Sequence, residues 1–366
     1  MGKSLKNQSL IDDQDYILKE FLKVVDAEKP DAVIIAGDVY DRSIPPVDAV
    51  NLFDEIIFKI IERKIPVLCI SGNHDSAARL NFGSRLFERS NFFIETLPNE
   101  NPKTVILNDN FGEIYFSLIP FFEPVEMQDK ISAEKIDADA ANKFYISEAR
   151  KNVPAGKRSV AVAHLFVTGG AVSESERKFV GAVENVSAAN FSAYNYTALG
   201  HLHKPQTMKK NDYIVRYSGS LLKYSFDEAN YDKGVTLVEI GGGETSYQHI
   251  NLIPRRDVRV VEGTIEELRK SPRTEDYIHA NLTDKNHVLN AMEKLRNDAF
   301  PNILSIKFTA IERELETSGA LELREDISVL EQFADFFEHE TGEKLQGEYR
   351  STMENFLRDI GLRIKD

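Results

Sequence analysis

The chain of 366 residues carries 45 lysine and arginine residues against 59 aspartate and glutamate residues, a formal net charge of −14. Its length suggests two domains, or one large domain with an appendage. With 42% hydrophobic and 28% charged residues it has the composition of a folded protein, and global disorder is excluded. The charge also excludes a protein that coats nucleic acid through bulk positive charge, although it leaves room for a local basic groove.

Cysteine usage and hydropathy narrow the class of protein further. The single cysteine, Cys69, cannot form an intrachain disulfide, which fits a reducing compartment. No run approaches the roughly 18 consecutive apolar residues of a membrane helix, and the first residues lack the apolar core of a signal peptide. We therefore expect a cytoplasmic protein that does not bind a membrane.

The first predicted elements form a βαβ unit preceded by a helix. Apolar residues at helical spacing predict an amphipathic helix around residues 11–28. Two short β-branched runs, 32–37 and 66–71, predict strands buried on both faces. Between them, a helical pattern begins after Pro46, a position where the missing N–H of proline does little harm.

Strands dominate the pattern after residue 90. We predict them at 103–107, 113–119, 159–164, 195–200, 213–218, 234–240 and 245–252, with a long helix over 132–152 and a hairpin turn at the glycine run 241–243. Strand–helix alternation followed by many strands indicates an α/β (α+β) fold in which two stacked mixed β-sheets are flanked by helices.

A second unit is predicted after Pro254. Strands at 257–266, 276–282 and 303–309 with a helix at 285–297 form a small α+β module. The tail holds two amphipathic segments, whose apolar stripes comprise Ile327, Leu330, Ala334 and Phe337 in one and Tyr349, Met353, Phe356 and Ile360 in the other. We place the domains at 1–254, 255–320 and 321–366.

Polar side chains with metal-binding chemistry lie at the ends of four predicted strands. They are Asp38 and Asp41, then Asn73, His74 and Asp75, then His164, and finally His201 and His203. Ligands bind beyond the carboxyl ends of strands in sheets of this kind. Carboxylate, amide and imidazole groups together suit Mn²⁺ or Fe²⁺, and the absence of a nearby thiolate argues against a zinc finger.

These motifs, GDxxD, GNHD, a solitary histidine and GHxH in this order, resemble those of the calcineurin-like metallophosphoesterase superfamily. Residues 217–222 (YSGSLL), after GHLHKPQ, are similar to the SbcD branch, the nuclease subunits of SbcC–SbcD complexes. One feature departs from the family, whose members begin with a strand carrying Asp-x-His. That strand and its two ligands are missing here, and we expect a misassigned start codon or a trimmed chain rather than a natural loss of activity.

The resemblance implies a two-metal site for hydrolysis of phosphodiesters. Asp38 would bridge two Mn²⁺ ions, with Mg²⁺ or Fe²⁺ as alternatives. Asn73, His164 and His201 would complete one metal site, and His203 would join the second, incomplete one. His74 would stabilise or protonate the leaving oxygen with its ring oriented by Asp75, whereas Asp41 would support the Asp38 loop without binding metal.

Substrate and partner follow from charge together with the resemblance. A local charge of +4 over 201–225 predicts contacts to DNA, for which the candidates are Arg79, Lys204, Lys209, Lys210, Arg216, Ser218 and Ser220. Residues 321–348 hold nine acidic and two basic residues. Such a tail suits a protein partner, which the resemblance identifies as an SbcC-type SMC-like ATPase.

We therefore predict the nuclease subunit of an SbcCD-type complex that is Mn-dependent and acts in DNA repair, replication and recombination. The resemblance implies 3′→5′ exonuclease activity on double strands, endonuclease activity on hairpins and single strands, ATP use by the partner, a homodimer within a 2:2 complex, and association with the nucleoid. Two alternatives stay open: a catalytically impaired scaffold for DNA ends, and a small-molecule phosphodiesterase or phosphatase of the same superfamily.

Overall fold

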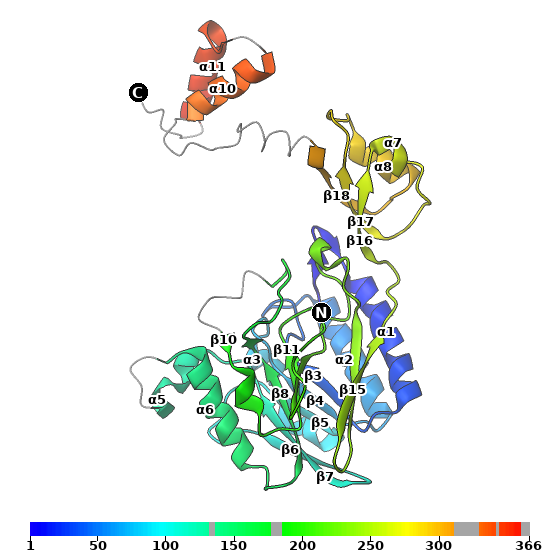
Figure 1. The fold of residues 1–366 in the computed structure, drawn as a ribbon, viewed down its shortest axis with the longest axis vertical. Helices are drawn as coiled ribbons and strands as arrows, with labels where there is room; N and C mark the ends of the chain where they lie inside the picture. Colours follow the sequence, from blue (N-terminus) through cyan, green and yellow to red (C-terminus); the bar gives the residue numbers. More distant parts are fainter. Residues whose placement is uncertain (132–135, 177–184, 311–328, 342–343, 360–366) are drawn as a thin grey trace. The chain divides into compact units, whose positions relative to one another are not determined.

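The computed structural model describes residues 1–131, 136–176, 185–310, 329–341 and 344–359. The chain forms two compact units, residues 1–282 with 288–307 and residues 283–287 with 308–366. In the first unit, Figure 1 shows β-sheets with helices α1 and α2 on one side and α6 on the other.

The predicted βαβ unit is confirmed and is extended by one strand. Helix α1 (Ile11–Glu28) precedes β3 (Val33–Ala36), α2 (Val47–Glu62), β4 (Val67–Ile70) and β5 (Phe92–Glu95). The three strands form a parallel sheet in the order β3-β4-β5. Strand β5 was not predicted, because its apolar run, residues 92–94, is only three residues long and ends at Glu95. Apolar residues of α1 and α2, among them Leu22, Phe53 and Ile57, pack on one face of this sheet.

The second sheet has six strands. They are β6 (Thr104–Asp109), β7 (Gly112–Ile119), β8 (Arg158–His164), β11 (Tyr196–Gly200), β12 (Gln206–Lys209) and β13 (Ile214–Tyr217), in the order β12-β13-β11-β8-β7-β6. The four central strands are parallel and the two edge strands are antiparallel. Strand β12 was not predicted because its QTMK sequence is mostly polar, as an edge position allows.

Helix α6 (Ala138–Lys151) covers the outer face of the six-stranded sheet. It begins later than predicted, because the Asp137 side chain caps it by accepting a 2.8 Å hydrogen bond from the Ala140 N–H. Residues 132–135 of the prediction lie outside the described residues.

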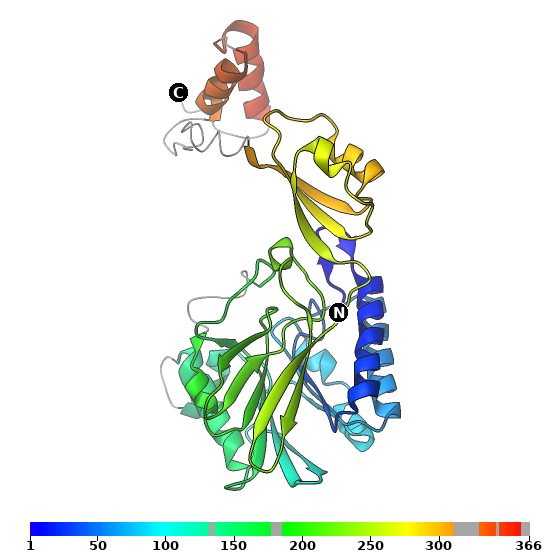
Figure 2. The same cartoon turned by 45° about the vertical axis from the view of Figure 1, so that its right-hand side comes forward.

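The two sheets stack face to face, as predicted. Leu68 and Ile70 of β4 pack against Phe116, Leu118 and Val162 of the second sheet. The hairpin of β14 (Gly234–Ile240) and β15 (Thr245–Asn251) turns at Gly241, whose N–H donates to the Glu244 carbonyl at 3.0 Å. Figure 2 shows the resulting layers edge-on, with helices outside and sheets between them.

Short elements complete this part of the chain. They are the hairpin β1 (Ser4–Leu5) and β2 (Gln8–Ser9), helices α3 (Ala77–Leu80), α4 (Ser84–Phe87) and α5 (Gln128–Ile131), strands β9 (Phe166–Val167) and β10 (Asn185–Val186), and the 3₁₀ turns η1 (Glu88–Ser90), η2 (Pro124–Met127), η3 (Ala188–Phe191) and η4 (Phe226–Glu228).

The α+β module follows the predicted order. It comprises β16 (Val258–Gly263), α7 (Ile265–Leu268), β17 (Tyr277–Leu282), α8 (Ala291–Asp298) and β18 (Ile303–Phe308). Helix α8 is shorter than the predicted 285–297. The buried Asp13 carboxylate of α1 accepts two hydrogen bonds from Arg256, at 2.8 and 2.7 Å, and one from the Tyr277 hydroxyl at 2.8 Å. These bonds tie the module to the first helix.

In the tail, α10 (Val329–Thr341) and α11 (Gly347–Asp359) pack against each other around Leu330, Leu345 and Leu357. Ile327 and Ile360 of the predicted stripes lie outside the described residues. Tyr349 and Phe356 are exposed. Within the described residues, none of the helices combines the length and apolar character that crossing a membrane requires.

Candidate metal centre

Asp38 lies just after β3, where the backbone turns sharply. Its φ is 49° and that of Gly37 is 87°, a conformation that favours glycine. A Cβ atom on Gly37 would lie only 2.3 Å from Nδ1 of His164, so the glycine lets the strand end approach that ring. Strained backbone of this kind is typical of functional sites. It brings Oδ2 of Asp38 within 3.3 Å of Nε2 of His164.

Asn73 and two histidines meet this carboxylate. The Asn73 side-chain oxygen lies 3.0 Å from Nε2 of His164 and 3.1 Å from Nδ1 of His201. One ligand atom each from Asp38, His164 and His201 falls within 4.8 Å of the others. The structure therefore brings together four of the side chains that the sequence predicts as metal ligands.

The sheet explains why the two histidines meet. In the parallel pairing of β8 and β11, His164 lies opposite Gly200, so His201 follows directly beside it. Nδ1 of His164 donates to the Ala36 carbonyl at 2.8 Å. Because a carbonyl only accepts, Nδ1 carries a proton, and Nε2, which faces the other ligands, is the nitrogen that would bind a metal in place of a proton. His201 takes a φ of 99°, a second strained residue at the same site.

The four side chains fit a divalent metal ion. Nε2 of His201 is buried and has no hydrogen-bond partner among the residues that the structure describes. Burial and the neighbouring His164 lower the pKa of His201 to about 3, so this ring is neutral and able to bind metal. Burial acts to raise the pKa of Asp38, but His164 and His74 outweigh it and hold this pKa well below its usual range.

His74 and Asp75 form a bridge between the loops after β3 and β4. Nδ1 of His74 lies 2.8 Å from the Asp41 carbonyl, and the His74 N–H donates to Asp38. The Asp75 carboxylate accepts hydrogen bonds from the N–H groups of Val39, Tyr40 and Gly72. The orientation of the His74 ring by Asp75 stays a prediction. The Asp41 main chain contacts the ring, and Asp75 fixes the two loops.

The Asp41 side chain pairs with a lysine. Its carboxylate forms a 2.7 Å ion pair with Lys3, which agrees with a supporting position rather than a ligand position.

His203 is not one of the three titratable residues whose ligand atoms converge. Nδ1 of its ring lies 2.8 Å from the Ser175 hydroxyl and 3.2 Å from Oε1 of Glu228. Its role at a second metal stays a prediction.

The predicted DNA contacts divide into two groups. The Lys204, Lys209 and Lys210 ammonium groups lie over tyrosine rings, 5.0, 5.8 and 5.6 Å from the ring centres. By contrast, Arg216 is buried, donates to Thr207 and Thr236, and stacks 4.6 Å from the centre of the Tyr247 ring. The Arg216 guanidinium is thus held between β12, β14 and β15, and its contact to DNA stays a prediction.

The remaining candidates lie at the rim of the site. The exposed Arg79 reaches the Ser43 carbonyl at 3.4 Å. The Ser220 hydroxyl donates to the Leu222 carbonyl at 2.7 Å, and its N–H donates to the His203 carbonyl at 3.1 Å. Ser218 lines a cavity beside the site.

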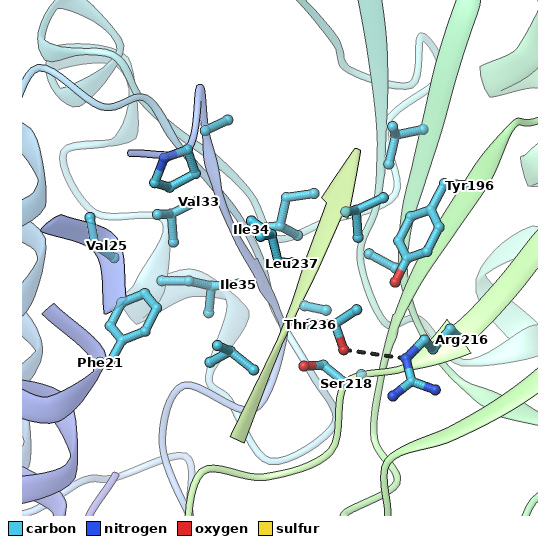
Figure 3. A pocket seen from close by; sticks show the side chains of 18 of the residues that line it. Phe21, Val25, Val33, Ile34, Ile35, Tyr196, Arg216, Ser218, Thr236 and Leu237 are labelled. Atoms are coloured by element: carbon cyan, nitrogen blue, oxygen red, sulfur yellow. Dashed lines mark hydrogen bonds between the residues drawn. The ribbon is translucent and has the colours of Figure 1, made fainter. Parts of the chain in front are cut away.

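This cavity, of about 1310 Å³, lies between β3 and β14. Among the described strands, β3 pairs with β4 and β14 pairs with β15, so each has one edge facing the cavity. Figure 3 shows apolar side chains on both walls, including Ile34 and Ile35 of β3 and Leu237 of β14. One end of the cavity reaches Asp38, His201 and His203. The sequence pattern predicted β3 as a strand buried on both faces. In the structure, however, Ile34, Ile35 and Ala36 are only half-buried, because one edge of the strand is open.

Three buried ionisable residues near His203 were not predicted. Glu228 is fully buried, and Glu176 and Lys233 are 3% and 6% exposed. The segment around Glu228 (SFDEANYDKG) has the polar composition of a surface turn, so no local signal distinguishes this glutamate.

Comparison with known proteins agrees with this geometry. Residues 11–205 match the family described as calcineurin-like phosphoesterase, and residues 254–341 match the family described as type 5 capsule protein repressor C-terminal domain. A GAP50 structure from Plasmodium, described as the anchor in the inner membrane complex, is 13% identical over 82% of this chain and 93% of its own, with a TM-score of 0.42. This value is too low to carry an argument.

Two curated relatives bear the name of the SbcD subunit of the nuclease SbcCD. The Staphylococcus epidermidis protein is 33% identical over 91% of this chain and 90% of its own. The Staphylococcus saprophyticus protein is 37% identical over 84% of this chain and 81% of its own. The metal-ligand types at the strand ends, the matching family and these long alignments agree, and the chain therefore belongs to the SbcD family of calcineurin-like phosphoesterases.

Proposed function

We propose that this chain is the nuclease subunit of an SbcCD-type complex and hydrolyses DNA phosphodiesters. The observation that carries the proposal is the buried cluster of Asp38, Asn73, His164 and His201, whose ligand atoms converge at the carboxyl ends of β3, β4, β8 and β11. Family membership supports a metal-dependent phosphodiester hydrolase, and the family's named members are nucleases.

The residues present divide the work of the reaction. Asp38, Asn73, His164 and His201 would hold a divalent metal, with Mn²⁺ the ion that the donor set favours. The metal supplies Lewis-acid activation of a water molecule and neutralises phosphate charge. His74, held by the Asp41 carbonyl, would stabilise the leaving 3′ oxygen. Asp75 would hold the loops of Asp38 and His74 together through its hydrogen bonds to both.

The cavity supports one additional strand in the three-stranded sheet. Its volume of about 1310 Å³ exceeds the ~300–1,000 Å³ typical of small-molecule sites. Apolar side chains line it, and free strand edges bound it on two sides, so an extended apolar segment would pair with both edges. We propose that the strand that fills this cavity ends in the family's Asp-x-His and so completes the second metal site with His203.

A chain extended by that strand gives a direct test. The Val33 N–H donates to the Pro66 carbonyl beside β4, so by strand alternation the N–H groups of Ile34 and Ala36 face the cavity. Extension should protect these two amides from hydrogen exchange, leave Val33 unchanged and raise bound Mn²⁺ from one to two per chain. Unchanged exchange at Ile34 and Ala36 would contradict the placement of the strand.

DNA and protein partners would use different surfaces. Lys204, Lys209 and Lys210, with Arg79, Ser218 and Ser220, are the proposed contacts to double-stranded and hairpin DNA. In the tail unit, Tyr349 and Phe356 are 69% and 54% exposed, an apolar surface that suits an SbcC-type ATPase, which would use the ATP.

A homodimer within a 2:2 complex is proposed from a second apolar surface. Val47 of α2 and Phe82 and Leu86 around α4 are 73%, 83% and 66% exposed, and large exposed apolar side chains often mark interaction sites. Replacing Phe82 and Leu86 by serine should lower the dimer fraction in sedimentation experiments without changing the free energy of unfolding.

The nuclease assay uses the extended chain with its ATPase partner, Mn²⁺ and hairpin DNA. We expect cleavage, 3′→5′ resection of double strands, and loss of both in His74→Ala. If the DNA stays uncut and His74→Ala behaves identically, the proposal fails. The described residues of this chain supply the ligands of one metal, which favours a scaffold for DNA ends as the second candidate. That candidate predicts at most one Mn²⁺ per chain even after extension.

A further inference from the structure

A buried polar network lies behind His203. Its members are Ser173, Ser175, Glu176, Ser225, Glu228 and Lys233. Glu228 has no exposed surface, and Lys233 and Glu176 are nearly as buried. Buried glutamate and lysine side chains are rare unless they are paired. The network draws on the loop 173–176, the turn η4 and the segment just before β14, so distant parts of the chain meet at one histidine.

The Glu228 carboxylate is the centre of this network. Its Oε1 lies 2.8 and 2.9 Å from the Ser175 and Ser225 hydroxyls and 3.2 Å from Nδ1 of His203. Its Oε2 forms a 2.6 Å ion pair with Lys233. The charge of Glu228 is therefore balanced on one side by lysine and solvated on the other by hydroxyls and imidazole.

The same network holds the backbone of His203. Its N–H donates to Glu176, and its carbonyl accepts a 2.8 Å hydrogen bond from Lys233. The Lys233 ammonium also donates to the Ser220 hydroxyl at 2.8 Å. Glu228 therefore acts on the ring of His203 directly, and on its backbone and the 218–220 loop through Lys233.

We propose that Glu228 is a positioning residue that fixes the tautomer and orientation of His203. The Ser175 hydroxyl donates to Oε1 of Glu228, so its oxygen is left to accept from Nδ1 of His203. The ionised carboxylate also only accepts, so Nδ1 carries the proton. The lone pair then lies on Nε2, the atom left to bind a ligand. The inference deepens the proposed function, because it rests on His203 as a metal ligand and assigns the side chain that prepares it.

A purely structural role is the competing explanation. A buried Glu–Lys pair can contribute to folding without affecting a site. The two roles differ in what they predict for the imidazole, because only a positioning residue controls which ring nitrogen is protonated.

The test measures the ring directly by ¹⁵N NMR of protein labelled at its eight histidines, with the His203 signals assigned through His203→Gln. We expect the wild-type protein to show protonated Nδ1 and unprotonated Nε2, and Glu228→Gln to show a mixture of tautomers. Ser175→Ala, which removes one hydroxyl beside Nδ1, provides a milder variant if Glu228→Gln does not fold; it should keep the Nδ1–H tautomer because the carboxylate remains.

Asp13→Asn is the matched control. It removes a buried carboxylate whose hydrogen-bond partners are Arg256 and Tyr277 and not His203, so it should leave the His203 tautomer unchanged. If wild-type His203 is protonated at Nε2, or if Glu228→Gln leaves the tautomer as in wild type, the inference is overturned.

Metal titration of the extended chain, followed by the EPR signal of free Mn²⁺, separates this inference from the proposed function. We expect Glu228→Gln to weaken binding of the second Mn²⁺ by about 10–100-fold, the usual effect of removing a partner of a ligating histidine. A tautomer change without any second Mn²⁺ in wild type would uphold the positioning role and reject His203 as a ligand. Equal affinity in wild type and variant would overturn the inference.

Discussion

Gly200 marks the closest contact between the two sheets at the metal centre, and Gly200→Ala is the perturbation that tests it. A Cβ atom there would lie 1.7 Å from the Ala36 carbonyl oxygen and 2.8 Å from Nδ1 of His164. Real Cβ atoms essentially never come closer than 3.0 Å to such neighbours, so β3 and β11 must separate by more than about 1 Å. The Ala36 carbonyl is also the acceptor that holds His164.

Two magnitudes follow from this displacement. Forcing an extra methyl group into a packed interior typically costs about 1–3 kcal/mol of stability. A shift of about 1 Å among catalytic groups can lower a rate by ~10²-fold, and here the shift separates Asp38 from His164 and His201. We therefore expect Gly200→Ala to lower the free energy of unfolding by about 1–3 kcal/mol in urea denaturation and to bind Mn²⁺ much more weakly.

Gly243→Ala is the matched control, because a Cβ atom at Gly243 meets nothing within 4 Å. It should stay within about 0.5 kcal/mol of the wild-type free energy of unfolding, the usual range for surface substitutions. If Gly200→Ala matches this control in stability and in Mn²⁺ affinity, then the close approach of β11 to β3 is wrong, and with it our account of how His164 and His201 are positioned.

Three further predictions concern the rest of the first unit. Burial raises the pKa of the Cys69 thiol well above its ordinary value, so a thiol reagent should label no cysteine in the native protein and one per chain in urea; fast native labelling would contradict the packing of β4. Arg256→Met leaves the Asp13 carboxylate buried without its cation and should lower the free energy of unfolding by about 3–5 kcal/mol in urea denaturation. A loss below about 0.5 kcal/mol, the usual scatter of surface variants, would contradict the contact. The Arg158 hydrogen bonds lower the pKa of Asp109, so the pair stabilises the folded state above the ordinary aspartate pKa of about 3.9 and loses this contribution as the pH falls through the lower folded value. The stability difference between wild type and Asp109→Asn should accordingly be constant from about pH 7 to 5 and shrink below about pH 4, and a difference that grows on acidification would reverse the sign we assign.

Much of the site could be predicted because its signals are local. Asp38, Asn73, His164 and His201 each lie at or shortly after the end of a strand whose apolar run is visible in the sequence, and parallel strands bring their carboxyl ends to one edge. The register that places Gly200 beside His164 follows from the same parallel pairing.

Other features depended on distant residues and escaped prediction. Arg216 reads as one of several basic residues in a charged segment, yet Thr207, Thr236 and Tyr247 enclose it. The apolar run of β5 is only three residues long and ends at Glu95, and β12 is mostly polar, so tertiary pairing alone decides both strands. Glu228 and Lys233 have the residue types of an exposed turn, and only the folded chain places them against His203.

The sequence by itself determined the chemistry of the site, because metal-ligand types, their order and the strands before them are written in short segments. The tertiary structure decided which charged side chains are available, which are buried as supports, and where a sheet edge stays open beside the metal centre. These depend on contacts between residues far apart along the chain, as between Asp13 and Arg256 or between β3 and β14. Burial and pairing of this kind leave no local pattern, since the same lysine or glutamate suits a solvated turn as well as a buried ion pair.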